Sequence, residues 1–273
     1  MTEASLFDPI QILYDSHHAL IKDAVLIIDN KIKAFGEEAR QLAQLSEIHP
    51  EEANEKLLAP CLVDPHSILL DPINGKSENL QSLIQKASAS GYGQLAVLPN
   101  GGVWRDAPNT LTGLNHFKSE VLMHWFGSLS LRGEGKELSP HADLLQYGAI
   151  GIAESHNIPP AELLRKTLLL NEIDNKPIFL APIDKSIQGD GIVREGVEAL
   201  RSGWVLDPIE SETIPLGQLI EYQKQYPNSL IRLMNISTSS AVSMLEKSEH
   251  KSLASVCWWN LVSDSSNLVP SDI

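Results

Sequence analysis

The residues best placed to do chemistry lie where an apolar stretch of the sequence ends in Asp64-Pro65-His66. A run of strand length that stops at a histidine puts that side chain where a buried barrel strand emerges at its catalytic rim. Side chains alternate along a strand, so a His-x-His pair directs two imidazoles at one ion. The second position here is Ile68. His66 is therefore a candidate metal ligand without a second histidine two residues later.

Other histidines are alternative sources of a metal site. The adjacent pair His17-His18 is of interest, and so is His156, which lies two residues after Glu154. Neighbouring histidines on an extended chain point in opposite directions, and single histidines at surfaces or helix ends are common. A relocated metal site is the less favoured hypothesis.

No other catalytic motif stands out. The two cysteines, Cys61 and Cys257, lie in apolar stretches far apart, which predicts buried free thiols rather than a disulfide or a metal pair. The glycine-rich segments 133–135 and 189–191 lack the third glycine and the strand-to-helix context of a dinucleotide loop. The serines lie in no nucleophile elbow.

The composition predicts a soluble, acidic protein. The chain has 273 residues, 42% of them hydrophobic, and a formal charge of -14. The apolar segment 24–28 is far too short to span a membrane and no signal pattern is present, which predicts a cytoplasmic protein. The negative charge repels phosphate backbones, so nucleic acid is not an expected partner. The acidic segment 47–55 is expected to be a solvated loop.

Two domains are expected. Residues 24–28 are apolar, Asp29-Asn30 suits a reversal, and residues 31–36 alternate, which predicts a β-hairpin. We assign this hairpin to an N-terminal segment, residues 1–58, and the rest of the chain, residues 59–273, to a main domain.

Apolar strand-like runs alternate with helix-period stretches throughout the main domain, which predicts an α/β fold with a parallel sheet. Strands are expected near residues 61–66, 94–98, 121–126, 149–153, 177–181, 229–235 and 253–258. Helical spacing is found near residues 80–87, 163–169, 220–226 and 242–245. This is the pattern of a (β/α)8 TIM-type barrel with about seven of its eight strands.

The segment around His66 resembles the first strand of the dihydroorotase branch of the amidohydrolase superfamily. That branch usually reads Pro-Gly-hydrophobic-Val-Asp-x-His-x-His-hydrophobic-Arg-Glu-Pro. Against this form Cys61 replaces the glycine, Ile68 the second metal histidine, Leu70 the substrate-binding arginine and Asp71 the glutamate. The resemblance implies an amidohydrolase barrel with an N-terminal β-sandwich segment, here incomplete at the C-terminus.

Two further segments carry the resemblance. Residues 29–36 are similar to the Gly-Lys-Ile-x-x-hydrophobic-Gly segment of the family's small sandwich. Residues 91–100 resemble the family's Gly-Gly-Phe-Thr-x-hydrophobic-x-x-Met-Pro-Asn, and this match implies that Asn100 binds substrate. The alternative is that residues 99–102 are simply a turn, because Pro, Asn and Gly favour turns.

The fourth strand resembles the family's Gly-Ala-hydrophobic-x-Phe-x-Asp-Asp-Gly. Some members place a metal-bridging aspartate here and others use a carbamylated lysine. Glu154 keeps a carboxylate at this place, so the resemblance makes it a residual metal candidate beside His66. A solvated glutamate at the rim is the favoured interpretation.

At three later strands the family's histidines are absent. Ala181 stands at the metal histidine of the fifth strand and Asn235 at that of the sixth, while Trp258-Trp259 occupy the region of the histidine pair in the seventh. The eighth strand, which carries the family's catalytic aspartate, is not in this sequence. The chain is then expected to be either a short form completed by a partner or a fragment.

These differences imply a catalytically silent dihydroorotase-like protein, because an amide hydrolase of this class needs metal ions to activate water. The resemblance suggests a structural or regulatory role in pyrimidine biosynthesis, with aspartate transcarbamoylase or a second copy of the chain as partner. The alternative is an active cyclic-amide hydrolase with a divergent or partner-completed zinc site. No cofactor is expected for the silent form, and zinc for the active one.

Overall fold

The computed structural model describes residues 4–13, 20–69, 78–99, 105–115, 119–170, 173, 175–264 and 267–268. The chain divides into two compact units, Met1–Leu62 and Val63–Ile273. The division falls at the start of strand β5 (Leu62–Ser67), a few residues after the boundary expected from the sequence.

The N-terminal unit is a four-stranded sheet with one helix. Its elements are β1 (Ala4–Leu13), β2 (Leu20–Ile28), β3 (Lys31–Phe35), α1 (Gly36–Leu45) and β4 (Pro50–Leu58). The strand order is β3-β2-β1-β4, in which β2 is antiparallel to its neighbours and β4 is parallel to β1. The predicted hairpin is confirmed, with φ of 51° at Asp29 and 59° at Asn30, as a two-residue turn with positive φ requires.

One expectation for this unit needs correction. The acidic segment 47–55 is not all loop, because β4 begins at Pro50. Ala53 is the one fully buried residue of β4, which lies at the sheet edge, so no apolar alternation marks this strand. The described residues of the unit form a single sheet, and the sandwich expected from the resemblance stays a prediction.

The larger unit alternates strands and helices. Its elements after β5 are α2 (Leu80–Ala89), β6 (Tyr92–Val97), α3 (Pro108–Asn115), β7 (Leu122–Trp125), β8 (Gly127–Ser128), α4 (His141–Gln146), β9 (Ile152–Glu154), α5 (Ala161–Leu170), β10 (Ile178–Leu180), α6 (Lys185–Gln188), β11 (Val193–Arg194), α7 (Val197–Arg201), β12 (Leu206–Asp207), α8 (Glu210–Gln225), β13 (Ile231–Leu233), α9 (Ser239–Lys247), β14 (Leu253–Ala254) and α10 (Trp259–Val262). Each of the seven predicted strand regions contains a strand, and α2, α5, α8 and α9 lie where helical spacing was found.

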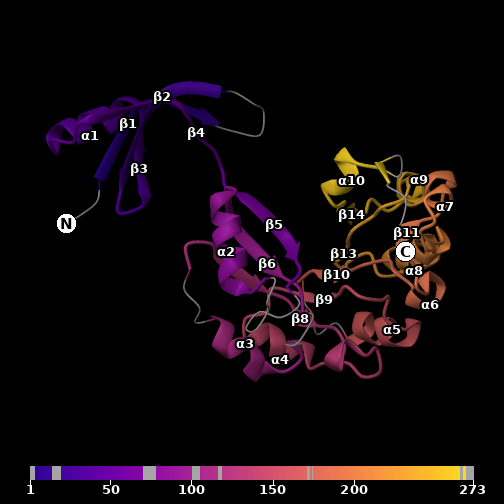
Figure 1. Cartoon of the computed structure of the whole chain (residues 1–273). Coiled ribbons are helices and arrows are strands. Elements are labelled where there is room, and N and C mark those ends of the chain that lie inside the picture. The colour runs from indigo at the N-terminus through magenta and orange to yellow at the C-terminus, as the bar shows by residue number, and fades with distance from the viewer. Residues whose placement is uncertain are drawn as a thin grey trace. The chain divides into compact units, whose positions relative to one another are not determined.

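Apart from β11 and β12, which form a separate two-stranded sheet, the strands of this unit follow one another in chain order. One sheet has the order β5-β6-β7 and the next runs β8-β9-β10-β13-β14. The chain passes from β7 into β8 through Phe126, whose N–H donates to Val97 O at 3.1 Å, while Ile150 N–H donates to Trp125 O at 2.9 Å. In Figure 1 the strands from β5 to β14 form an arc. The result is a mixed α/β fold in which β5 and β14 are the two ends of the strand series.

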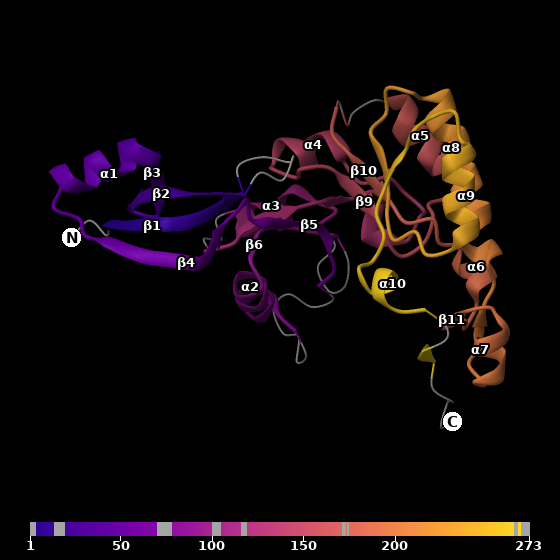
Figure 2. The ribbon, with the colours of Figure 1, turned by 90° about the horizontal axis from the view of Figure 1, so that it is seen from above.

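Alternate residues of these strands enter two separate cores. The outer core joins strand residues such as Ile152 and Leu233 to helix residues such as Leu164 and Leu216. Figure 2 shows α5, α8 and α9 along one flank of the unit. The inner core holds the opposite faces of the strands, and its buried members are Ala96, Leu98, Phe126, Ala153, Ala181 and Met234. The inner face, on which a functional site would lie, is therefore filled with apolar side chains.

No helix in the described part of the chain combines the length and apolar character needed to cross a bilayer.

Candidate functional site

His66 lies at the end of β5, as expected, and its ring contacts the opposite end of the strand series. Its Nε2 lies 2.7 Å from Ser255 Oγ, just after β14. The backbone N–H of Asn235 donates to the same Ser255 Oγ at 3.1 Å. The structure thus brings together three positions separated by up to 189 residues: the retained histidine, the asparagine at the sixth strand and a serine at the seventh.

The turn around His66 is held by Asp64. The Asp64 carboxylate accepts the backbone N–H of His66 at 3.1 Å and the hydroxyl of Ser67 at 2.5 Å. On its other side the His66 ring lies 6.1 Å from the ring of Phe179, measured between centroids. Because Phe179 packs against the inner core, the imidazole is on the inner side of the strand series.

A cavity of about 410 Å³ opens between the ends of β5 and β14. Its polar lining residues include Asp64, His66, Tyr92, Asn235 and Ser255, and its described lining contains no lysine or arginine. Trp258 also lines it and is 63% exposed. The indole predicted near the pocket is therefore at its opening, and the described residues give the cavity hydrogen-bond donors and an aromatic surface but no cation.

Glu154 is not a solvated rim residue, contrary to one reading of the sequence. It is 4% exposed, and its carboxylate accepts the hydroxyl of Ser130 at 3.1 Å. Burial raises the pKa of Glu154 to about 7, and the hydrogen bond from Ser130 opposes this rise. The carboxyl group is thus close to half-protonated at neutral pH.

His66 and Glu154 do not converge. Ala153 belongs to the inner core, and successive side chains of a strand point to opposite faces. Glu154 therefore points away from the inner side, toward the segment that carries Ser130. The two residual metal candidates face different surroundings.

The residues at the family's metal positions do not fit a zinc ion. Ile68 is apolar, Ala181 is fully buried in the inner core, and Asn235 has a φ of 56° and uses its backbone N–H on Ser255. No group of three His, Cys, Asp or Glu side chains suited to a metal occurs among the described residues. Zinc sites in proteins use three or four such donors, so His66 alone does not form one.

Several sequence-based assignments lie outside the described residues: Asn100, Leu70, Asp71 and the pair His17-His18. Two other histidines that are described serve local structure. His124 hydrogen-bonds Gln94 at 3.0 Å, and buried His141 donates to Leu129 O at 2.8 Å. The pKa of His156 is lowered by partial burial and by the positive charge of Lys185.

Both cysteines were expected to be buried, and both are exposed. Cys61 immediately precedes β5, and Cys257 lines the cavity beside Trp258. Their apolar neighbours indicated a core, but these neighbours belong to the terminal strands of the series. Leu62 and Val256 are themselves exposed large apolar residues.

Sequence reasoning missed Arg105, a fully buried cation. Its Nε donates to Phe126 O at 3.0 Å, its Nη2 donates to Val97 O at 3.0 Å and also to Leu98 O, and the guanidinium lies 5.2 Å from the Trp125 ring centroid. Burial lowers its pKa to about 10. It joins the carboxyl ends of β6 and β7. An isolated arginine in a loop carries no signal that would reveal this role.

A second set of charged residues ties α8 to the segment before α9. Buried Glu212 accepts the backbone N–H groups of Ser237 at 2.7 Å and Thr238 at 2.9 Å. Arg194 pairs with Asp207 at 3.0 Å. These groups satisfy one another and leave no open ligand position.

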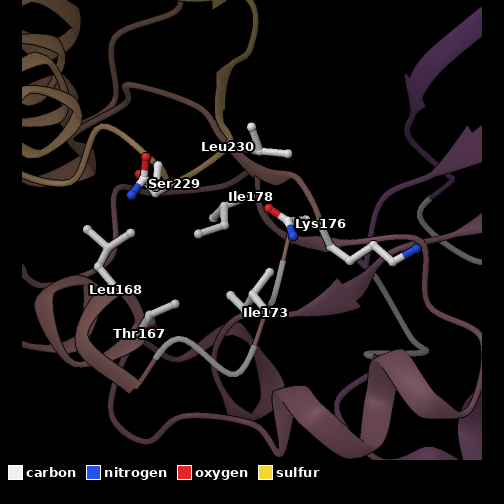
Figure 3. A pocket seen from close by; sticks show the side chains of 9 residues that line it. Thr167, Leu168, Ile173, Lys176, Ile178, Ser229 and Leu230 are labelled. Atoms are coloured by element: carbon white, nitrogen blue, oxygen red, sulfur yellow. The ribbon is translucent and has the colours of Figure 1, made fainter.

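Figure 3 shows a different cavity, of about 30 Å³, at the amino-terminal side of β10 and β13. Apolar side chains such as Leu168 and Ile173 line it, and the Lys176 amino group points away from it in Figure 3. This volume suits about one water molecule. Catalytic groups of parallel barrels lie at the opposite, carboxyl ends of the strands, so this cavity is not the candidate site.

The fold and the arrangement of its strands identify the class of structure to which the chain belongs. No family model matches the chain. The structure resembles that of N-acyl-D-glutamate deacylase from Bordetella bronchiseptica, solved with zinc, with a TM-score of 0.57 at 12% identity over 92% of this chain and 57% of that one. It also resembles dihydroorotase from Saccharomyces cerevisiae, with a TM-score of 0.51 at 13% identity over 76% and 58%. The fold is that of the amidohydrolases.

Sequence comparison identifies the family within this class. A probable dihydroorotase-like protein of Synechocystis sp. is 31% identical over 233 residues, which are 76% of this chain and 53% of that protein. The dihydroorotase of Syntrophotalea carbinolica is 26% identical over 239 residues, 86% of this chain and 55% of that enzyme. The chain is a distant, dihydroorotase-like member of the amidohydrolase superfamily. It spans about half the length of the curated relatives it matches.

Proposed function

We propose that this chain is a catalytically silent dihydroorotase-like protein that serves pyrimidine biosynthesis in the cytoplasm as a structural or regulatory partner. The observation that carries the proposal is the state of the metal positions. Ala181 is sealed in the inner core and Asn235 is committed to Ser255 through its backbone. Water activation at a metal, which the family's amide hydrolysis needs, has no ligand set among the described residues.

The lining of the cavity also supports catalytic silence, because it is poorly suited to the family's anionic substrate. Dihydroorotate carries a carboxylate, and a buried or half-buried carboxylate is normally met by a charge-assisted donor. Among the described residues that line the cavity there is no lysine or arginine, and Asp64 adds a negative charge to it. An anionic ring therefore has no cationic partner in this described lining.

We propose that the larger unit is part of a (β/α)8-type barrel. The support is the chain-order arrangement of β5 to β10, β13 and β14 and the cavity between the ends of β5 and β14. Large apolar side chains are exposed on both sides of this opening, among them Val63, Val256 and Trp258. Exposed apolar groups at unpaired strand edges favour association.

Aspartate transcarbamoylase is the partner that we propose, on the strength of the dihydroorotase resemblance. Mixing the two purified proteins at about 10 µM and measuring mass by size-exclusion chromatography with light scattering should give a complex. Trp258→Ser should weaken it, whereas Leu169→Ser, at a 53% exposed position on α5, should not. No complex at this concentration overturns the partner, and a dimer of the chain alone would replace it with a second copy.

Catalytic silence is tested on the chain itself. Metal analysis after incubation with zinc, together with assays of dihydroorotate ring opening and ring closing, should show substoichiometric zinc and no turnover. The Syntrophotalea carbinolica enzyme serves as the positive control in the same assay. Stoichiometric zinc with turnover that Ser255→Ala leaves intact would refute the proposal.

A further inference from the structure

The contact between His66 and Ser255 has the geometry of a serine nucleophile beside its general base. An imidazole nitrogen 2.7 Å from a serine hydroxyl is within the hydrogen-bond reach that an activated nucleophile requires. Both side chains are partly exposed, and both line the cavity of about 410 Å³. The hydroxyl is therefore accessible to a small molecule.

The hydrogen bonds around the Ser255 hydroxyl leave its proton directed at the histidine. Ser255 Oγ accepts the Asn235 N–H at 3.1 Å, and its one hydrogen is free to be donated to His66 Nε2. In this arrangement the Nδ1 of the imidazole carries the ring proton. The Asn235 N–H also stabilises negative charge that develops on Oγ when the proton leaves.

We infer that Ser255 is a nucleophile toward acyl compounds and that His66 accepts its proton. Ser255 Oγ attacks the carbonyl carbon of an ester while its proton passes to His66 Nε2. The bond from the carbonyl carbon to the alcohol oxygen then breaks, and His66 returns the proton to the leaving alcohol. Water repeats the sequence on the acyl-serine, which releases the carboxylic acid and restores the hydroxyl.

The lining of the cavity selects the class of compound. Asp64 is an acidic side chain of the lining, and because no described lining residue is a lysine or arginine, an anionic acyl group is disfavoured. Trp258, Val256 and Ile68 give an apolar wall. Tyr92 and Asn235 carry donors suited to a carbonyl oxygen. The fitting substrate is a neutral ester with an apolar or aromatic acyl group.

This activity needs no metal, so it is compatible with the proposed loss of the family's metal-dependent amide hydrolysis. The competing explanation is that the same hydrogen bond only holds β5 and β14 together, and the two explanations predict different reactivity of Ser255. A purely structural serine is as unreactive as any surface serine, whereas a nucleophilic serine reacts with electrophiles that target activated hydroxyls.

The test is covalent labelling of the full chain with a fluorophosphonate probe in the presence of a chelator, followed by intact mass measurement and peptide mapping. We expect one adduct, located on Ser255, together with hydrolysis of p-nitrophenyl butyrate. Ser255→Ala should abolish the adduct, and His66→Gln should slow labelling by about 100-fold or more. Ser252→Ala is the matched control, because this hydroxyl hydrogen-bonds Gln223 outside the cavity, and it should label at the wild-type rate.

The wild-type result is decisive even where a variant folds poorly. Absence of an adduct on Ser255 in the wild-type chain, or an adduct confined to Cys257 or Tyr92, overturns the inference. Equal labelling rates for the wild type and a folded His66→Gln variant, checked by circular dichroism, overturn the role of the histidine.

Discussion

Glu154 provides a quantitative test of burial in the larger unit. Its carboxyl group is buried, and its pKa rises from the ordinary 4.5 to about 7 in the folded chain. Between these two values the folded state holds one more proton than the unfolded state, so the free energy of unfolding falls as the pH rises from 4.5 to 7. The shift corresponds to about 3 kcal/mol, fully lost above pH 7.

Glu154→Gln removes this loss, because the amide is nearly isosteric, stays neutral and can still accept the Ser130 hydroxyl. We expect the variant to exceed the wild type by up to about 3 kcal/mol in free energy of unfolding at pH 8, and to equal it near pH 4.5. Urea unfolding followed by tryptophan fluorescence is the assay, since all 5 tryptophans lie beyond residue 62 and report the larger unit.

Glu162→Gln is the matched control, because Glu162 is exposed on α5 and its pKa is lowered by Lys166. This variant should gain nothing at pH 8. The reasoning is refuted if Glu154→Gln changes stability equally at both pH values, or lowers it at pH 8. The latter result would mean that a cation, such as a metal, stabilises the carboxylate.

Three further substitutions test packing and capping. Ala181→His should cost about 2 kcal/mol by overpacking the inner core, and isothermal titration should detect no tight zinc binding; tight binding would contradict the misfit of this site. Glu212→Ala should cost about 3 kcal/mol in urea unfolding, because it strands the N–H groups of Ser237 and Thr238; an unchanged midpoint would show that water replaces the carboxylate. Gly151→Ala should lower the thermal midpoint, because a Cβ there would lie 2.4 Å from a backbone oxygen, and an unchanged midpoint would argue against this close approach.

The central strands of the series were predictable because most of their residues are buried or half-buried. β10 is a continuous apolar run, and β13 is apolar apart from Arg232, so sequence patterns detect both well. β4 was missed for the opposite reason, since a strand at a sheet edge with one buried residue leaves no periodic signal. Burial of the strand, rather than its hydrogen bonding, is what the sequence records.

The site was less predictable because it depends on side-chain direction and distant contacts. The sequence placed Glu154 at a strand end, but its burial follows from Ser130 in a separate segment. Ser255 carries no motif, and its approach to His66 joins residues 189 positions apart. Which face of a strand holds a residue is set by register, and a shift of one residue would exchange the two faces.

The inner core also explains why single substitutions would not rebuild the family's metal site. A histidine or carboxylate buried without its ion leaves polar atoms unpaired, which costs about 1–3 kcal/mol for each group. Ala181 and Met234 instead pack against Leu98 and Phe126 and satisfy the core without a metal. A single restored ligand would disrupt this packing and would gain no metal ion in return, because the other ligands would still be absent. The apolar residues at the ligand positions and the filled interior therefore stabilise each other.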